Sequence, residues 1–217
     1  MERSELAIVI PAWNEEKSIA RVVQSVLLYG IAIVVNDKSS DNTAQYAQDA
    51  GANVVNHIVN KGYDGALNSG FKRASELGCK YIITFDADGQ HDFKLIPTFC
   101  KLFEEGNDLV VGIRPKAARF GEFVFSVVTQ IRFGLKDPLC GMKGYRIEVY
   151  NKRGFFDSCK SIGTELTIWA LRNKYKLAQL PIPIHDREGQ SRFGKIIRAN
   201  YMIITGMIRV LRVTKER

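Results

Sequence analysis

The chain has 217 residues, of which 46% are apolar and 25% charged, and its formal net charge is +8. This length and composition suit one globular domain with a full core and exclude a disordered, collagen-like or disulfide-stapled chain. The positive charge is uneven, because residues 187–217 hold eight Lys or Arg and two Glu, a net +6. An anionic partner is therefore expected at the tail rather than over the whole surface.

The cysteines give no sign of a metal or disulfide framework. Cys79, Cys100, Cys140 and Cys159 form no C-x-x-C pair and no zinc-type cluster with histidine, so reduced thiols are expected. The sequence shows neither a signal-peptide pattern nor an uninterrupted apolar run of about 18 residues, the length that a membrane span needs. We therefore expect a cytoplasmic protein without a membrane span.

Residues 1–112 alternate between short apolar runs and segments of helical periodicity. Strands are expected at 6–10, 31–35, 53–55, 81–85 and 109–111. Helices are expected at 19–27, 43–50, 67–77 and 95–103. This alternation predicts an α/β fold, with a mostly parallel twisted sheet flanked by helices.

The alternation of strand and helix patterns ends after residue 112. A basic loop at 114–119 precedes a mixed apolar segment at 120–135. Further along, a helix is expected near 164–173 and a strand near 177–184. We expect one domain over 1–194.

The pattern of residues 195–217 predicts an amphipathic helix, with cations on one side and aliphatic side chains on the other. Such a helix suits the interface of a membrane with anionic headgroups. Docking of the helix on the chain's own core, or on a second copy of the chain, is the alternative. Asn200 lies within the apolar side and favours docking.

Two carboxylates follow the strand expected at 81–85. Asp86 and Asp88 stand at i and i+2, and open α/β sheets bind ligands beyond the carboxyl ends of their strands. A divalent cation such as Mg²⁺ or Mn²⁺, which prefers oxygen ligands and shares them with phosphates, would neutralise such a pair. The alternative for an isolated D-x-D is a solvated turn.

Further motifs decide between these interpretations. Six segments occur in order: 10–15 (IPAWNE), 35–43 (VNDKSSDNT), 60–62 (NKG), 86–91 (DADGQH), 137–141 (DPLCG) and 187–192 (REGQSR). Together they closely resemble the family-2 glycosyltransferases of the GT-A (Rossmann-like) fold. The similarity is greatest to dolichyl-phosphate mannose synthase and bacterial polyprenyl-phosphate glycosyltransferases. It spans nearly the whole chain.

The resemblance implies a site for a nucleotide-sugar donor, UDP- or GDP-linked, with Mg²⁺ or Mn²⁺ as cofactor. The donor-binding residues it implies are Pro11, Trp13, Glu15, Asp37, Lys61, Ala87, Arg187 and Arg192. The metal ligands it implies are Asp86, Asp88 and Gln90, and the catalytic residues are Asp88, Arg187 and Glu165. The usual Asp-Asp pair is Asn36-Asp37 here, which leaves the base preference open. A core aromatic is the alternative for Trp13, and a solvated basic loop is the alternative for the two arginines.

The acceptor side is more ambiguous. Glu165 matches an acid of the acceptor side, which serves as base towards a hydroxyl but is dispensable towards a phosphate; a plain first-turn helix acid is the alternative. Cations at Arg114, Arg119 and Arg132 favour an acceptor phosphate, with simple surface charge as the alternative. Cys140 replaces the usual Ser of its motif, and we expect it to be a small buried residue.

The sequence thus predicts an inverting transfer of a sugar from a nucleotide to a polyprenyl phosphate, by a peripheral enzyme at the cytoplasmic membrane face. A glycosyltransferase with a sugar-hydroxyl acceptor is the second hypothesis. A non-catalytic module that binds nucleotides or nucleic acid has only the basic charge in its favour, since no nucleic-acid motif is present. No nucleic-acid partner is therefore expected, and pairing of the chain into a homodimer stays open.

Overall fold

A computed structural model describes residues 1–115, 119–183 and 196–214. Among these residues, seven strands form one sheet in the order β3-β2-β1-β4-β6-β5-β7. The strands are β1 (Leu6–Ala12), β2 (Ile31–Asn36), β3 (Asn53–Asn56), β4 (Tyr81–Thr84), β5 (Leu109–Ile113), β6 (Lys143–Arg146) and β7 (Leu177–Pro181). The helices are α1 (Ile19–Val26), α2 (Thr43–Asp49), α3 (Gly62–Glu76), α4 (Ile96–Glu104), α5 (Phe120–Phe133), α6 (Ile147–Arg153), α7 (Glu165–Arg172) and α8 (Ile196–Val213).

The expected α/β fold is confirmed. Strands β3, β2, β1 and β4 run parallel, and β5 runs parallel to β7. Strand β6 is the exception, because it pairs antiparallel with both β4 and β5. Since β4 and β5 both oppose β6, they point the same way, and the carboxyl ends of β1, β2, β4, β5 and β7 share one edge of the sheet.

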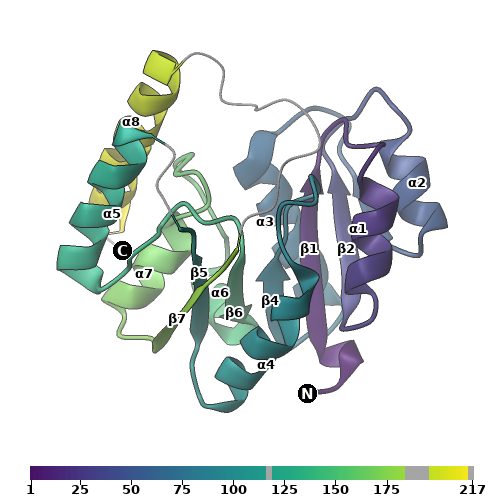
Figure 1. Ribbon diagram of the computed structural model, residues 1–217, viewed down its shortest axis with the longest axis horizontal. Helices are drawn as coiled ribbons and strands as arrows, with labels where there is room; N and C mark the ends of the chain where they lie inside the picture. Colours follow the sequence, from purple (N-terminus) through teal and green to yellow (C-terminus); the bar gives the residue numbers. More distant parts are fainter. Residues whose placement is uncertain (116–118, 184–195, 215–217) are drawn as a thin grey trace.

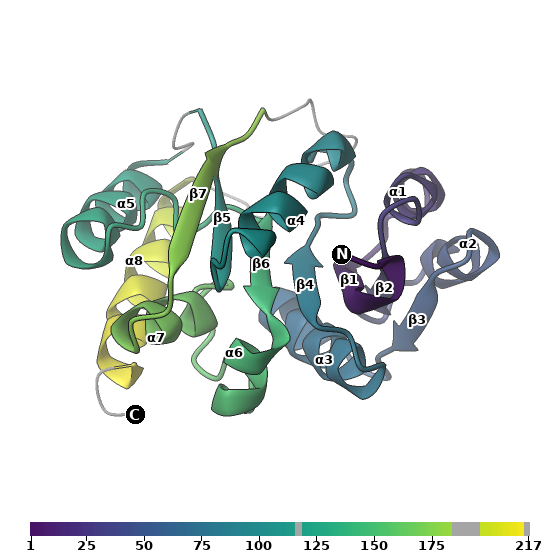
Figure 2. The ribbon, with the colours of Figure 1, turned by 90° about the horizontal axis from the view of Figure 1, so that it is seen from below.

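Helices cover both faces of the sheet (Figures 1 and 2). Along β1, Leu6, Ile8 and Ile10 pack with α1, α2 and α4, whereas Ala7 and Val9 pack with α3, α6 and α7. Every residue of β1 is buried, which explains why its sequence is continuously apolar rather than alternating.

Helices α5 and α8 lie side by side at the β7 end of the molecule (Figures 1 and 2). With α7 they enclose a small core of Phe125, Ile168, Ile203, Met207 and Val210. The apolar side of the C-terminal helix therefore docks on the chain's own core, as the alternative interpretation of segment 195–217 held. Within the described ranges, no helix combines the length and apolarity needed to cross a bilayer.

Candidate active site

The candidate site lies at the sheet edge where β1, β2 and β4 end. The Asp37 N–H donates to the Ala12 carbonyl at 2.9 Å, and the Phe85 N–H donates to the Val9 carbonyl at 2.9 Å. These bonds extend the parallel ladders to Asp37 itself, and to Ala12 and Phe85, which come directly before Trp13 and Asp86. The three segments that the sequence assigned to donor and metal are thus brought to one edge, the usual ligand edge of an open α/β sheet.

The two acidic residues of the D-x-D segment have different surroundings. Asp88 is buried, and its Oδ1 accepts the backbone N–H of Gln90 at 3.1 Å. Asp86 is more open, with 29% of its side chain exposed. Gly89 between them and Gln90 has a φ of +75°, a left-handed conformation that lets the chain turn there.

Gly141, from the 137–141 motif, forms a wall beside Asp86. A Cβ at residue 141 would stand 2.4 Å from Asp86 Oδ2. The Thr84 hydroxyl fixes this approach by donating to the Gly141 carbonyl at 2.6 Å. The loop after α5 therefore closes against the end of β4 and leaves room only for a glycine.

His91 orients Asp86 from the other side, a role that the sequence analysis did not assign. The Asp86 N–H donates to His91 Nδ1 at 3.1 Å, so the proton of the neutral imidazole sits on Nε2. That nitrogen lies 3.5 Å from Asp86 Oδ2. The ring is buried edge-on against Phe85, with centroids 5.3 Å apart. The sequence signal for this role is the position of His91 at the end of the 86–91 motif.

These residues fit a divalent cation. Asp86, Asp88 and Gln90 offer carboxylate and amide oxygens within five residues of chain, the donor type that Mg²⁺ and Mn²⁺ prefer. The absence of a side chain at Gly141 leaves room for the Asp86 carboxylate, which is 29% exposed, and His91 restrains it from the other side. An ion held by these carboxylates would also bind phosphate oxygens, so this edge suits a nucleoside diphosphate.

Asp37 builds the neighbouring part of the edge. Its carboxylate accepts the N–H groups of Lys61 at 2.7 Å and Gly62 at 2.8 Å, and lies 2.7 Å from His57 Nδ1. The Asn60 amide also donates to the Asp37 carbonyl at 3.0 Å. Asp37 thereby holds the 60–62 motif at the start of α3, with the Lys61 side chain exposed. Contact of Asp37 with a base remains a prediction.

The loop after β1 is attached to the loop after β2. Asn14 has a φ of +55°, its N–H donates to Ser39 Oγ at 3.0 Å, and its Oδ1 accepts the Ser40 N–H at 2.8 Å. Glu15 is buried and donates its N–H to Thr43 Oγ1 at 2.8 Å. This arrangement leaves 43% of Trp13 exposed, so the indole is not a core aromatic. Pro11 is buried in β1 and Ala87 is buried in the segment after β4.

The predicted acceptor arginines do not form one group. Arg114 pairs with Asp137 through Nε at 2.8 Å and Nη2 at 2.9 Å, and with Glu122 at 3.1 Å. Arg119 pairs with the same Glu122 at 2.9 Å. Arg132 lies exposed in the last turn of α5, about 20 Å along the helix from Arg119. Arg114 and Arg119 are therefore close enough to act together, and Arg132 is not.

Glu165 is fully buried in the first turn of α7, the position that the plain alternative described. It forms an ion pair with the buried Arg153 and accepts the Ser158 N–H at 2.6 Å. Burial favours the neutral acid, but the Ser158 N–H and the Arg153 guanidinium outweigh it and lower the pKa of Glu165. Glu165 also lies within 4.8 Å of Asp157 and Cys159. Internal partners occupy its oxygens, an arrangement that suits a structural anchor better than a base.

The buried Lys143 and the half-buried Asp64 both contact the backbone of Gly163. Lys143 donates to the Gly163 carbonyl at 2.6 Å, and Asp64 accepts the Gly163 N–H at 2.6 Å. Burial lowers the pKa of Lys143 to about 8 and, with help from the Asp157 carboxylate, raises the pKa of Asp64 to about 7. Burial also raises the pKa of the Cys140 thiol to about 12, which agrees with a small buried residue rather than a reactive thiolate.

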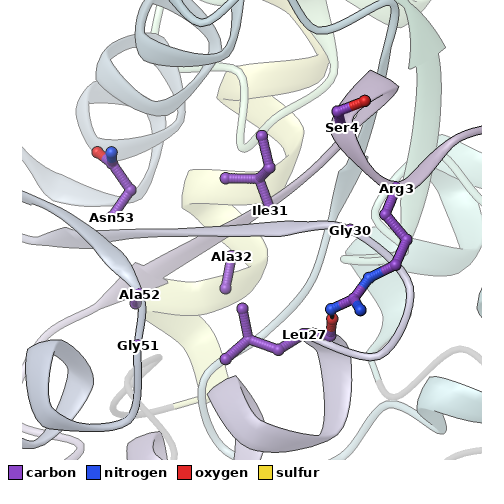
Figure 3. A pocket seen from close by; sticks show the side chains of 9 residues that line it. All are labelled: Arg3, Ser4, Leu27, Gly30, Ile31, Ala32, Gly51, Ala52 and Asn53. Atoms are coloured by element: carbon purple, nitrogen blue, oxygen red, sulfur yellow. Dashed lines mark hydrogen bonds between the residues drawn. The ribbon is translucent and has the colours of Figure 1, made fainter.

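A hollow of about 500 Å³ lies at the opposite edge of the sheet. Residues at the amino ends of β1, β2 and β3 line it, and the Arg3 guanidinium donates to the Leu27 carbonyl there (Figure 3). None of the predicted site residues borders this hollow. Arg187 and Arg192, which the sequence assigned to the donor, lie outside the described residues.

Comparison with known proteins decides the family. The sequence profile described as "Glycosyl transferase family 2" matches residues 7–180. The chain belongs to this family of glycosyltransferases. Its fold is GT-A: it superposes on glucosyl-3-phosphoglycerate synthase from Mycobacterium tuberculosis, solved with Mn²⁺ and UDP-glucose, with a TM-score of 0.73 at 21% identity, over 94% of this chain and 78% of that one.

Two relatives of the glycosyltransferase carry names that specify an acceptor. A dolichyl-phosphate hexose transferase from Haloferax volcanii is 27% identical over 87% of this chain and 86% of its own length. A UDP-N-acetylglucosamine–dolichyl-phosphate N-acetylglucosaminyltransferase from Methanococcus voltae is 28% identical over 81% of this chain and 83% of its own. The expected family is therefore confirmed.

Proposed function

We propose that this glycosyltransferase is a metal-dependent inverting enzyme that moves a sugar from a UDP- or GDP-linked donor to a polyprenyl phosphate at the cytoplasmic membrane face. The observation that carries the proposal is the open Asp86 carboxylate, held between Gly141 and His91 beside the buried Asp88. Asp86, Asp88 and Gln90 would hold Mg²⁺ or Mn²⁺. When bound, the ion supplies Lewis-acid stabilisation of the departing nucleoside diphosphate.

The chain's own residues then have distinct tasks. The exposed Trp13 offers a ring for the base, and Asp37 positions the Lys61 side chain beside the donor. Arg114 and Arg119, aligned by Glu122, lie at the carboxyl end of β5 and would position an acceptor phosphate. Arg187 and Arg192 would add positive charge near the leaving group.

The surroundings of Glu165 support a phosphate acceptor. A hydroxyl acceptor needs a general base, whereas a phosphate monoester is already an anion at neutral pH. Glu165 is buried and paired with Arg153, which supports the phosphate acceptor. The names of the relatives from Haloferax volcanii and Methanococcus voltae agree with this choice.

A direct assay tests the proposal. The full chain is incubated with UDP- and GDP-sugars, Mn²⁺ or Mg²⁺ and a polyprenyl phosphate, and the glycolipid and released nucleotide are measured. Asp88→Asn should abolish metal-dependent transfer. Asp92→Asn is the matched control, because Asp92 only caps the next helical turn through the Lys94 N–H and Asn caps equally well. Transfer only to sugar hydroxyls, or full activity in Asp88→Asn, would contradict the proposal.

A further inference from the structure

Helix α5 has an unusual composition for a helix on the surface. Its 14 residues, FGEFVFSVVTQIRF, include two charged side chains, Glu122 and Arg132, and Glu122 is buried. A surface helix normally presents its polar side to water. The outward side of α5 instead carries a stripe at helical spacing: Phe120, Phe123, Val127 and Ile131, with exposures of 69%, 58%, 38% and 81%.

Helix α8 continues this surface. The Gly121 N–H donates to Asn200 Oδ1 at 2.8 Å near the start of both helices. At their other ends, Arg172 donates to the Leu211 carbonyl and lies over the Phe133 ring. The two helices therefore run parallel and adjacent (Figures 1 and 2). More than half of the large apolar side chains exposed in the described part of the chain lie on them: Phe120, Phe123, Val127, Ile131, Tyr201, Met202 and Ile208.

The charges on this surface have one sign. Helix α8 contains no acidic residue, and its outward side carries the exposed Arg198, Arg209 and Arg212 among Tyr201 and Ile208. Arg132 is exposed at the end of α5. Apolar and aromatic side chains interleaved with arginine, without exposed carboxylates on either helix, match a bilayer interface with anionic headgroups.

The surface also begins at the catalytic edge. Helix α5 follows β5, whose carboxyl end shares the sheet edge with β4 and Asp86, and Phe120 is its first residue. A bilayer against α5 would therefore meet the protein next to Arg114 and Arg119.

We infer that the outward faces of α5 and α8 form the surface by which this glycosyltransferase lies on an anionic lipid bilayer, with Phe120 and Phe123 inserted at the interface. This inference specifies the membrane contact of the proposed function, and rests on it for the acceptor. The sequence analysis expected the membrane contact at segment 195–217. Because the apolar side of α8 is buried, the contact instead lies on α5 and on the opposite, exposed side of α8.

Vesicle sedimentation with the full chain tests the inference. Wild type should bind phosphatidylcholine vesicles that contain phosphatidylglycerol, more weakly at high salt, and should bind pure phosphatidylcholine less. Phe120→Ser/Phe123→Ser should reduce the partition coefficient by about tenfold or more, because it removes two large apolar groups from the interface. Leu28→Ser/Tyr46→Ser is the matched control and should bind like wild type. It alters exposed apolar residues directly after α1 and on α2, helices that lie on the side of the molecule away from α5 and α8 (Figures 1 and 2).

Three results would overturn the inference. The first is wild type that binds none of the vesicles, and the second is a Phe120→Ser/Phe123→Ser variant that binds them as wild type does. The third is a wild-type dimer, seen by light scattering, that this variant separates into monomers. The last result would assign the surface to a second copy of the chain. Arg198→Gln/Arg212→Gln, which leaves the core untouched, gives a second measurement and should remove most of the salt-sensitive binding. Thermal shifts with UDP or GDP and Mn²⁺ report the donor site separately, so loss of vesicle binding is distinguishable from loss of the proposed function.

Discussion

The carboxylate of Asp86 lies against the Cα of Gly141, 55 residues further along the chain, so closely that a Cβ there would stand 2.4 Å from Oδ2 and 2.9 Å from Cγ. An alanine must therefore displace the carboxylate or move the loop. Gly141 has no positive φ in this structure, so the steric contact rather than backbone strain requires a glycine.

Gly141→Ala should raise the Mn²⁺ concentration for half-maximal transfer by about tenfold or more, since a ligand displaced by an ångström loses much of its contribution. Titration of activity with metal at saturating donor measures this change. Gly206→Ala on α8 is the control, because its new Cβ meets atoms no nearer than 3.6 Å. An unchanged metal requirement in Gly141→Ala would show that Asp86 is not a ligand in the observed position.

His91 should act as a positioning residue for Asp86. His91→Ala leaves the Asp86 N–H without the Nδ1 acceptor and removes the Nε2–H that faces Oδ2. We expect weaker Mn²⁺-dependent binding of UDP or GDP, by about tenfold, in a calorimetric titration without acceptor. His91→Asn, which keeps a short side chain with an acceptor and a donor, should recover part of the affinity. Equal losses in both variants, matched by equal drops in melting temperature, would indicate a purely structural role.

The parallel half of the sheet could be predicted from the sequence because burial on both faces makes its strands continuously apolar, as in β1. Strand β6 could not, because KGYR has no strand pattern and its first residue is a buried lysine. Helix α5 was expected only as a mixed apolar segment, since apolar residues surround its whole circumference and hide the helical period. The predicted helix 67–77 begins earlier, at Gly62, because Asp37 accepts the N–H groups of its first turn.

The candidate site likewise contains residues that the sequence could predict and residues that it could not. Asp86 and Asp88 were predictable because they are neighbours in the sequence and follow a strand. Gly141 beside Asp86 and His57 beside Asp37 depend on contacts between distant segments, which motif spacing does not encode. Arg114 was predicted for its charge, but its pairing with Asp137 and Glu122 arises only in the folded chain.

Glu165→Gln distinguishes an anchor from a base. Removing one partner of the buried pair leaves the Arg153 charge uncompensated, so the variant should lose about 3 kcal/mol of stability. At temperatures where it is folded, transfer to polyprenyl phosphate should stay within about threefold of wild type, because a phosphate acceptor needs no base. Urea denaturation and initial rates measure the two effects. Normal stability with abolished turnover would identify Glu165 as a base and favour a hydroxyl acceptor.

The half-buried Asp64 should make the free energy of unfolding fall as the pH rises. Burial raises the pKa of Asp64 from 3.8 to about 7, so between these values the folded chain holds a proton that the unfolded chain has released. The free energy of unfolding therefore decreases across this window, by up to about 1.4 kcal/mol per pH unit for one proton. Asp64→Asn should flatten the decrease, whatever its effect on stability at any single pH, because the amide does not titrate. Urea denaturation between about pH 4 and about pH 7 measures the slope, with Asp49→Asn, which removes an exposed carboxylate of α2, as the matched control. The same slope in wild type and Asp64→Asn would show that Asp64 is ionised in the folded protein, held by Lys143 and the N–H groups of Ile162 and Gly163.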